Sequence, residues 1–353
     1  MRKLLLSLCL LALPVFATAQ QRAALLTPHG TLFTLEQHVT EDESGSTSAY
    51  LILRSQHGTD SIEEIVPNTL EGANVDPAMA YDAESRTLFV FWLRRVGITA
   101  SQLVFAYRDA EGIWSAAEEF GQQYDDRENL RIAITRKVTE EDGSVGNTPA
   151  VSVHLVWWEF DSDSDTPQEG ARYMMLTIDN GKVVERTSLD LKQFAKLPEP
   201  TPEPGTDSED VEAPAPADTN VDVDRSVLKQ PLVFASQSQD SILVVFGDTD
   251  TRRLHQVRIR PSRPPVSDGR LRVPVGRQEG GASGPKFVAA NNSRIEGIYG
   301  DTDRMAIYTR DGNQLSYTIL KDGTWSDSRA LALDDQLSAS DAVDALRRLV
   351  NEH

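Results

Sequence analysis

The sequence predicts an all-β fold, and three observations support this prediction. Its apolar segments are short and rich in β-branched and aromatic residues, they are bounded by Asp, Ser, Gly or Asn, and they recur along the chain. The clearest segments are Thr87 to Trp92, Val153 to Trp158, Ile242 to Phe246 and Ile295 to Tyr299. Because these segments are almost continuously apolar, we expect strands that are covered on both faces.

Two pairs of segments are near-copies of each other. A Gly-Asp-Thr-Asp turn begins at Gly247 and again at Gly300, 53 residues later. The segment from Gln102 to Ser115 matches the segment from Gln314 to Ser326, since each reads as a strand, an Asp/Gly turn and a second strand that opens with Trp-Ser. Asp-Gly turns between apolar runs are the strongest local signal of a β-hairpin.

Three weaker copies of the same hairpin are Tyr50 to Pro67, Ala171 to Asp190 and Leu254 to Val275. A period near 50 residues, with about four strands in each period, predicts a β-propeller of about five blades. Each blade is a small sheet that buries its faces by stacking against its neighbours. The alternative is a β-sandwich with ordinary hairpins.

The hairpins at Asp109 to Trp114 and Asp322 to Trp325 resemble the blade hairpins of bacterial sialidase-like and fucose-lectin-like propellers. The second hairpin lacks the spacer of the full sialidase Asp-box pattern. A sialidase-like site also implies a cluster of arginines that grips the substrate carboxylate. The arginines that follow strand ends are Arg94, Arg95, Arg108, Arg252, Arg304 and Arg310.

The first residues have the layout of a secretory signal. Arg2 and Lys3 precede an apolar run from Leu4 to Phe16, and Ala17-Thr18-Ala19 offers a cleavage site after Ala19. We therefore expect residues 1–19 to be removed and the mature protein to be periplasmic or secreted.

The mature chain is predicted to form a single propeller-like domain over residues 20–337. Residues 196–224 are rich in Pro and acidic residues and contain no aromatic residue, which predicts a disordered insertion in a loop of that domain. A helix is expected at residues 338–353. Ser340 is its predicted cap, and its apolar face is Ala342, Val343, Leu346, Leu349 and Val350.

The composition excludes several classes of function. The chain has a net charge of −19, so long-range repulsion disfavours binding to nucleic acid or to anionic lipid. No segment after the signal approaches the length of a membrane span. The single cysteine, Cys9, lies within the signal, which removes thiol nucleophiles and thiolate metal sites from the mature chain.

The twin Gly-Asp-Thr-Asp turns provide the candidate binding residues. Carboxylates and basic residues meet there, and they would suit a cation or a sugar hydroxyl if they are not simply bonded to nearby backbone. These residues are Asp248, Asp250, Arg252, Asp301, Asp303 and Arg304.

The alternating carboxylates Asp161, Asp163 and Asp165 form a weak calcium candidate. They match the first half of a calcium-binding loop, but Thr166 and Arg172 stand where the EF-hand pattern has Gly and Glu. Calcium is the only cofactor that the sequence suggests.

No catalytic set stands out, because acidic residues are too abundant for any pair to be distinguished. We therefore expect a non-catalytic binding or scaffold protein that uses the loop face of the propeller, with an envelope protein or a glycan as partner. The alternative is a sialidase-like glycoside hydrolase.

Overall fold

The computed structural model describes residues 22–41, 47–97, 100–120, 126–136, 151–161, 168–179, 181–194, 225–236, 241–250, 253–259, 294–299, 304–311, 313–321, 324–333 and 339–351. Within these residues, strands dominate and helix is limited to a few short segments, so the fold is all-β as predicted. The expected signal (1–19) and the expected insertion (196–224) lie outside the described residues.

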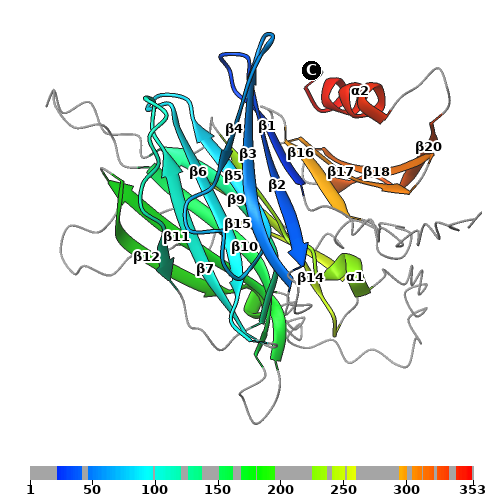
Figure 1. Ribbon diagram of the computed structural model, residues 1–353. Helices are drawn as coiled ribbons and strands as arrows, with labels where there is room; N and C mark the ends of the chain where they lie inside the picture. Colours follow the sequence, from blue (N-terminus) through cyan, green and yellow to red (C-terminus); the bar gives the residue numbers. More distant parts are fainter. Residues whose placement is uncertain are drawn as a thin grey trace, which may run out of the picture.

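The strands form consecutive antiparallel meanders, which we call units 1 to 5 (Figure 1). Units 1 and 2 share one sheet through a single parallel pair, Ala49 with Ala73. Unit 1 contains β1 (Arg22–Leu26), β2 (Thr31–Glu41), β3 (Thr47–His57) and β4 (Asp60–Ile65). Unit 2 contains β5 (Ala73–Asp82), β6 (Thr87–Arg95), β7 (Ser101–Arg108) and β8 (Glu118–Phe120).

The remaining units form separate sheets. Unit 3 contains β9 (Asp126–Arg136), β10 (Val151–Asp161), β11 (Gln168–Asp179) and β12 (Lys182–Asp190). Unit 4 contains β13 (Leu232–Ser236), β14 (Ser241–Asp248) and β15 (Arg253–Ile259). Unit 5 contains β16 (Ile295–Tyr299), β17 (Met305–Asp311), β18 (Gln314–Lys321), β19 (Thr324–Trp325) and β20 (Arg329–Ala332). The short segments η1 (Leu191–Phe194) and α1 (Arg225–Leu228) follow β12 and precede β13, and α2 (Ala339–Asn351) ends the described chain.

The units stack face to face in chain order, and each interface has its own apolar cluster. Strand β10 shows why its sequence is almost continuously apolar. Val153 and Leu155 pack toward unit 2, whereas Val156 and Trp158 pack toward unit 4. Because successive side chains of a strand point to opposite faces, both faces must be apolar when both are covered. The expectation of strands buried on both faces is confirmed.

The stack ends at helix α2, which packs against β16, β17 and β18 (Figure 1). Ala342, Leu346 and Val350 are buried on the face of unit 5 that points away from unit 4. The prediction that Leu349 belongs to this face is wrong, because that side chain is 46% exposed. Among the described residues, no apolar cluster joins unit 5 to unit 1, so they do not show the sheets closed into a ring.

The first strands of the five units lie side by side. Strand β1 contacts β5, β5 contacts β9, β9 contacts β13, and β13 contacts β16. The strands with which the five units begin therefore form a continuous row of neighbours. No helix in the described part of the chain is long and apolar enough to cross a membrane.

The predicted Trp-Ser repeat is confirmed in units 2 and 5. Ser115 Oγ accepts a hydrogen bond from Tyr107 N, and Ser326 Oγ accepts the equivalent bond from Ile319 N, both at 3.0 Å. The preceding tryptophans pair with Arg108 and Leu320, which are also equivalent in the sequence alignment. In unit 2 the turn is closed by Gly112, whose φ of 84° is accessible without strain only to glycine.

Candidate functional site

A cavity of about 370 Å³ lies where the first strands of units 1, 2, 3 and 5 meet. This volume falls within the range of small-molecule sites. Its lining combines seven apolar residues with three charged ones. The lining residues are Ala23 and Ala24 of β1; Pro77, Ala78 and Met79 of β5; Leu130, Arg131 and Ile132 of β9; and Arg294 and Glu296 at β16.

Two neighbouring β-bulges shape the wall of this cavity. The register of β5 shifts between Val75 and Ala78, and β9 shifts opposite Val156 and Trp158. Asp76 and Asn129 lie within these bulges at positive φ, 49° and 59°, and Asn129 N donates to Asp76 Oδ2 at 2.9 Å. Each such residue costs about 1 to 2 kcal/mol of backbone strain, and bulges commonly re-aim side chains beside functional sites.

The charged side chains come from two strands that meet across the cavity. Arg294 Nε lies 2.8 Å from Glu296 Oε1, so this pair is largely neutralised. Arg131 Nη2 donates to the carbonyl oxygen of Ile295 at 3.3 Å, which is its only hydrogen bond among the described residues. Burial, reinforced by the charge of Arg294, lowers the pKa of Arg131 to about 10, so it remains cationic at neutral pH.

The backbone of Ile295 fixes the position of these charges. Its carbonyl accepts from Arg131, and its N–H donates to Gln230 Oε1 at 2.8 Å. Gln230 is itself buried and bonded through Nε2 to the carbonyl of Ser226. Units 3 and 4 therefore both hold the start of β16, and with it Arg294 and Glu296.

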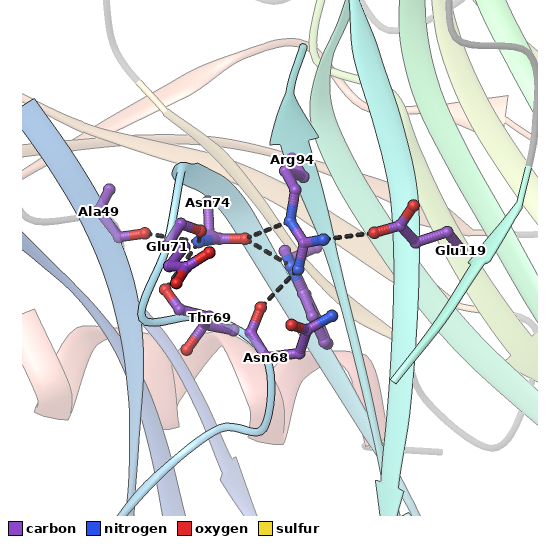
Figure 2. Close-up of polar contacts among 8 residues, drawn as sticks. Ala49, Asn68, Thr69, Glu71, Asn74, Arg94 and Glu119 are labelled. Atoms are coloured by element: carbon purple, nitrogen blue, oxygen red, sulfur yellow. Dashed lines mark hydrogen bonds and ion pairs between the residues drawn. The ribbon is translucent and has the colours of Figure 1, made fainter. Parts of the chain in front are cut away.

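The wall formed by β5 is anchored to unit 1 by Asn74, which is fully buried (Figure 2). Its Nδ2 donates to the carbonyls of Ala49, Thr69 and Glu71 at 2.7, 2.9 and 3.1 Å. Its Oδ1 accepts from Trp92 Nε1 at 2.9 Å and from Arg94 Nε at 3.3 Å. We call this cluster the Asn74 joint.

The wall formed by β9 is anchored to unit 2 by Arg127. This side chain bonds the carbonyl of Ser101, and its Nε lies 3.2 Å from Glu159 Oε2. Glu159 also accepts from Trp157 Nε1 at 3.0 Å and from Arg172 Nε at 2.8 Å. We call this cluster the Glu159 joint.

The predicted binding carboxylates Asp248 and Asp250 lie at the end of β14, away from the cavity lining. Asp250 N donates to Asp248 Oδ1 at 3.1 Å, which is a local turn contact. Asp250 Oδ2 lies 2.9 Å from Lys192 Nζ, and this hydrogen bond raises the pKa of Lys192. Both carboxylates thus have structural partners, as the turn interpretation anticipates.

Of the remaining predicted site residues, Arg304 directly precedes β17 and is half-buried. Arg252, Asp301 and Asp303 lie outside the described residues. So do Asp163 and Asp165 of the calcium candidate, whereas the backbone of Asp161 ends β10. Where the chain is described, no group of three or more His, Cys, Asp or Glu is placed to hold a metal ion.

The arginines expected for a sialidase-like site do not converge where they are described. Arg94 pairs with Glu119, Arg95 pairs with Asp126, and Arg108 Nε lies 2.8 Å from Glu64 Oε2.

The sequence interpretation missed Arg131 and Arg294. The available signal was the position of Arg131 inside the short run Leu130-Arg131-Ile132-Ala133-Ile134, whose other four residues are apolar. The signal is weak, because the same strand carries other charged residues at both ends.

No protein-family model and no curated protein matches this chain. Among solved structures, AofleA from Arthrobotrys oligospora is similar with a TM-score of 0.29 and 10% identity, over 90% of this chain and 87% of that chain. An arginine-to-alanine triple variant of AofleA gives a TM-score of 0.28 with the same identity and coverage. Likenesses at this level carry no argument about fold or ligand.

Proposed function

We propose that this chain is an exported, non-catalytic binding protein built as a β-propeller, and that its ligand binds in the central cavity. The observation that carries the proposal is the open cavity itself, which is bordered by the first strands of units 1, 2, 3 and 5. Propeller blades surround a central channel, and small-molecule sites are concave with a few placed polar groups.

The stacking order supports the propeller part of this proposal. The meanders follow one another in chain order, and each first strand contacts the next one. A β-sandwich would instead pack two sheets face to face around one core. The volume of the cavity favours a small molecule, or the end of a glycan, over an extended protein surface as the ligand.

Ligand screening with a blocked cavity tests the proposal. Ala24 lines the cavity from β1 and is exposed, so the Ala24→Trp variant fills the space from an edge strand. Ala332 is an exposed alanine of β20 outside the lining, and Ala332→Trp is the matched control. The measurement is the thermal midpoint of the three proteins against a library of small metabolites and oligosaccharides.

We expect compounds that raise the thermal midpoint of the wild type and of Ala332→Trp but not of Ala24→Trp. A library without hits, or hits that stabilise all three proteins equally, contradicts binding in the cavity. The glycoside hydrolase alternative predicts release of reporter from a panel of aryl glycosides, and we expect none. Export is checked by sequencing the N-terminus of the mature protein, which should begin after Ala19.

A further inference from the structure

We propose that the ligand of the central cavity is a small organic monoanion with a compact apolar body, and that Arg131 binds its anionic group. This inference rests on the proposed function and adds the chemical class of the ligand. Its starting point is the charge of the cavity. The lining contains two guanidinium groups and one carboxylate, in a chain whose net charge is −19.

Among the described residues, Arg131 is the charged residue of the lining that forms no ion pair, although the carboxylates of Glu296 and Asp76 act on it electrostatically. Arg294 Nε lies 2.8 Å from Glu296 Oε1, and both side chains of this pair are exposed. Arg131 has a single hydrogen bond among the described residues, to a backbone carbonyl at 3.3 Å, although a guanidinium has five N–H donors. Because Arg131 lines the cavity, it is suited to a planar anion such as a carboxylate, which a guanidinium can bind through two parallel hydrogen bonds.

The position of Arg131 is set before any ligand arrives. Its strand β9 is fixed to unit 2 by the Glu159 joint, and its carbonyl partner belongs to Ile295, which Gln230 holds. A preorganised cation loses little conformational entropy when it binds an anion. Partial burial further strengthens its interaction with an anion, because the local dielectric constant is lower than that of water.

The apolar residues of the lining carry no hydrogen-bonding side chain. They are Ala23, Ala24, Pro77, Ala78, Met79, Leu130 and Ile132. Each hydroxyl of a sugar that loses water without gaining a partner costs about 1 to 3 kcal/mol. A carboxylate on a compact hydrocarbon body avoids this penalty and can contact Ala23, Ala24 and Ile132, the apolar lining residues that are not buried in the cores between units.

Isothermal titration with three probes tests the proposal without any variant. The probes are benzoate, its neutral analogue benzamide, and glucuronate, a sugar acid with the same anionic group. We expect benzoate to bind at least about tenfold more tightly than benzamide, because the charge-assisted bond to Arg131 is lost in the amide. We expect glucuronate to bind more weakly than benzoate, because its hydroxyl groups lack side-chain partners.

Variants of Arg131 then locate the binding. Arg131→Gln should weaken benzoate at least about tenfold and leave benzamide unchanged, whereas Arg131→Lys, which keeps the charge but not the planar fork, should give an intermediate affinity. Arg329→Gln removes an exposed arginine of β20 and should change neither affinity.

Three results overturn the inference: equal affinities for benzoate and benzamide, glucuronate binding more tightly than benzoate, or benzoate affinity that does not respond to Arg131→Gln. Absence of benzoate binding at concentrations up to about 10 mM also overturns it. These failures are distinct from failure of the proposed function. If neutral compounds bind and Ala24→Trp blocks them, the cavity is a binding site for another class of ligand.

Discussion

The Asn74 joint and the Glu159 joint both link the first strand of a unit to the preceding unit, but they use different polar groups. In each, the second residue of a first strand, Asn74 or Arg127, reaches back to a backbone carbonyl of the preceding unit. In each, the indole N–H of a tryptophan on the second strand of the unit, Trp92 or Trp157, donates to an oxygen of the cluster.

The difference lies in how the buried polar groups are balanced. Asn74 is neutral, and its two amide hydrogens are shared among three carbonyls while its oxygen accepts from the Trp92 indole. Arg94 also donates to this oxygen, and its charge is paired with Glu119 (Figure 2). The Glu159 joint instead buries a carboxylate between two guanidinium groups, Arg127 and Arg172. Neighbouring sheets can therefore be linked by a neutral amide or by a set of opposite charges, provided that every buried polar group has a hydrogen-bond partner.

The largest effect is expected at the Asn74 joint. Asn74→Ala leaves three carbonyls and the Trp92 indole N–H without their partner, and should lower the free energy of unfolding by about 4 kcal/mol. Urea denaturation measures the change. The matched control is Asn313→Ala at an exposed position before β18, which should change stability by less than about 0.5 kcal/mol. Equal losses in the two variants contradict the role assigned to the joint.

The next largest effect is expected at the Glu159 joint. Glu159→Gln removes the negative charge that contacts the buried Arg127, whose side chain is 4% exposed, and should lower the free energy of unfolding by about 3 kcal/mol. Glu63→Gln, which breaks the exposed pair with Arg54, should cost less than about 1 kcal/mol.

A double-mutant cycle sharpens the comparison between the joints. Combining Arg127→Ala with Glu159→Ala should show a coupling energy above about 1 kcal/mol, because the two residues share one buried cluster. Additive effects would mean that the two side chains stabilise the protein independently and that the joint is not a unit.

A further prediction concerns pH and a fully buried histidine of unit 3. His154 is fully buried, with Nε2 2.8 Å from Thr135 Oγ1 and Nδ1 2.8 Å from the Tyr173 hydroxyl. Burial lowers the pKa of His154 to about 3. The native state thus holds the neutral ring, and its contribution to stability is complete above the unfolded pKa of about 6.5 and is lost as the pH falls toward 3.

Between pH 6.5 and 5, this titration should remove about 2 kcal/mol from the free energy of unfolding. His154→Gln keeps polar contacts available and should show that much less acid destabilisation over the interval, whereas the exposed His29→Gln should follow the wild type. Urea denaturation at both pH values measures the difference. Identical slopes for the wild type and His154→Gln would show that His154 is accessible to protons in the native state.

Short sequence patterns predicted two hairpins, a strand that is buried on both faces, and the terminal helix. The Trp-Ser repeat predicted two hairpins whose serines make the same backbone bond, because a hairpin depends on a short stretch of sequence. The continuous apolarity of Val153 to Trp158 predicted a strand covered on both faces. The terminal helix was anticipated, but Leu349 was misassigned, since helical spacing does not show how wide a face its neighbour covers.

The candidate site was not predicted, because its residues are scattered. Ala24, Met79, Arg131 and Arg294 come from four units that are far apart in the sequence, and no motif joins them. The Asp-rich turns were more conspicuous in the sequence, yet Asp248 and Asp250 bond to the turn and to Lys192.

The sequence by itself determined the strand character, the repeated hairpins, the acidic charge and the predicted signal, because each depends on residues close together in the chain or on composition alone. Only the tertiary structure decided that Asn74 and Arg127 link neighbouring units and that Arg131 borders a cavity between units. These roles depend on bulges and on contacts between strands of different units. Stacking the units brings such residues together, and nothing in their spacing along the chain encodes that proximity.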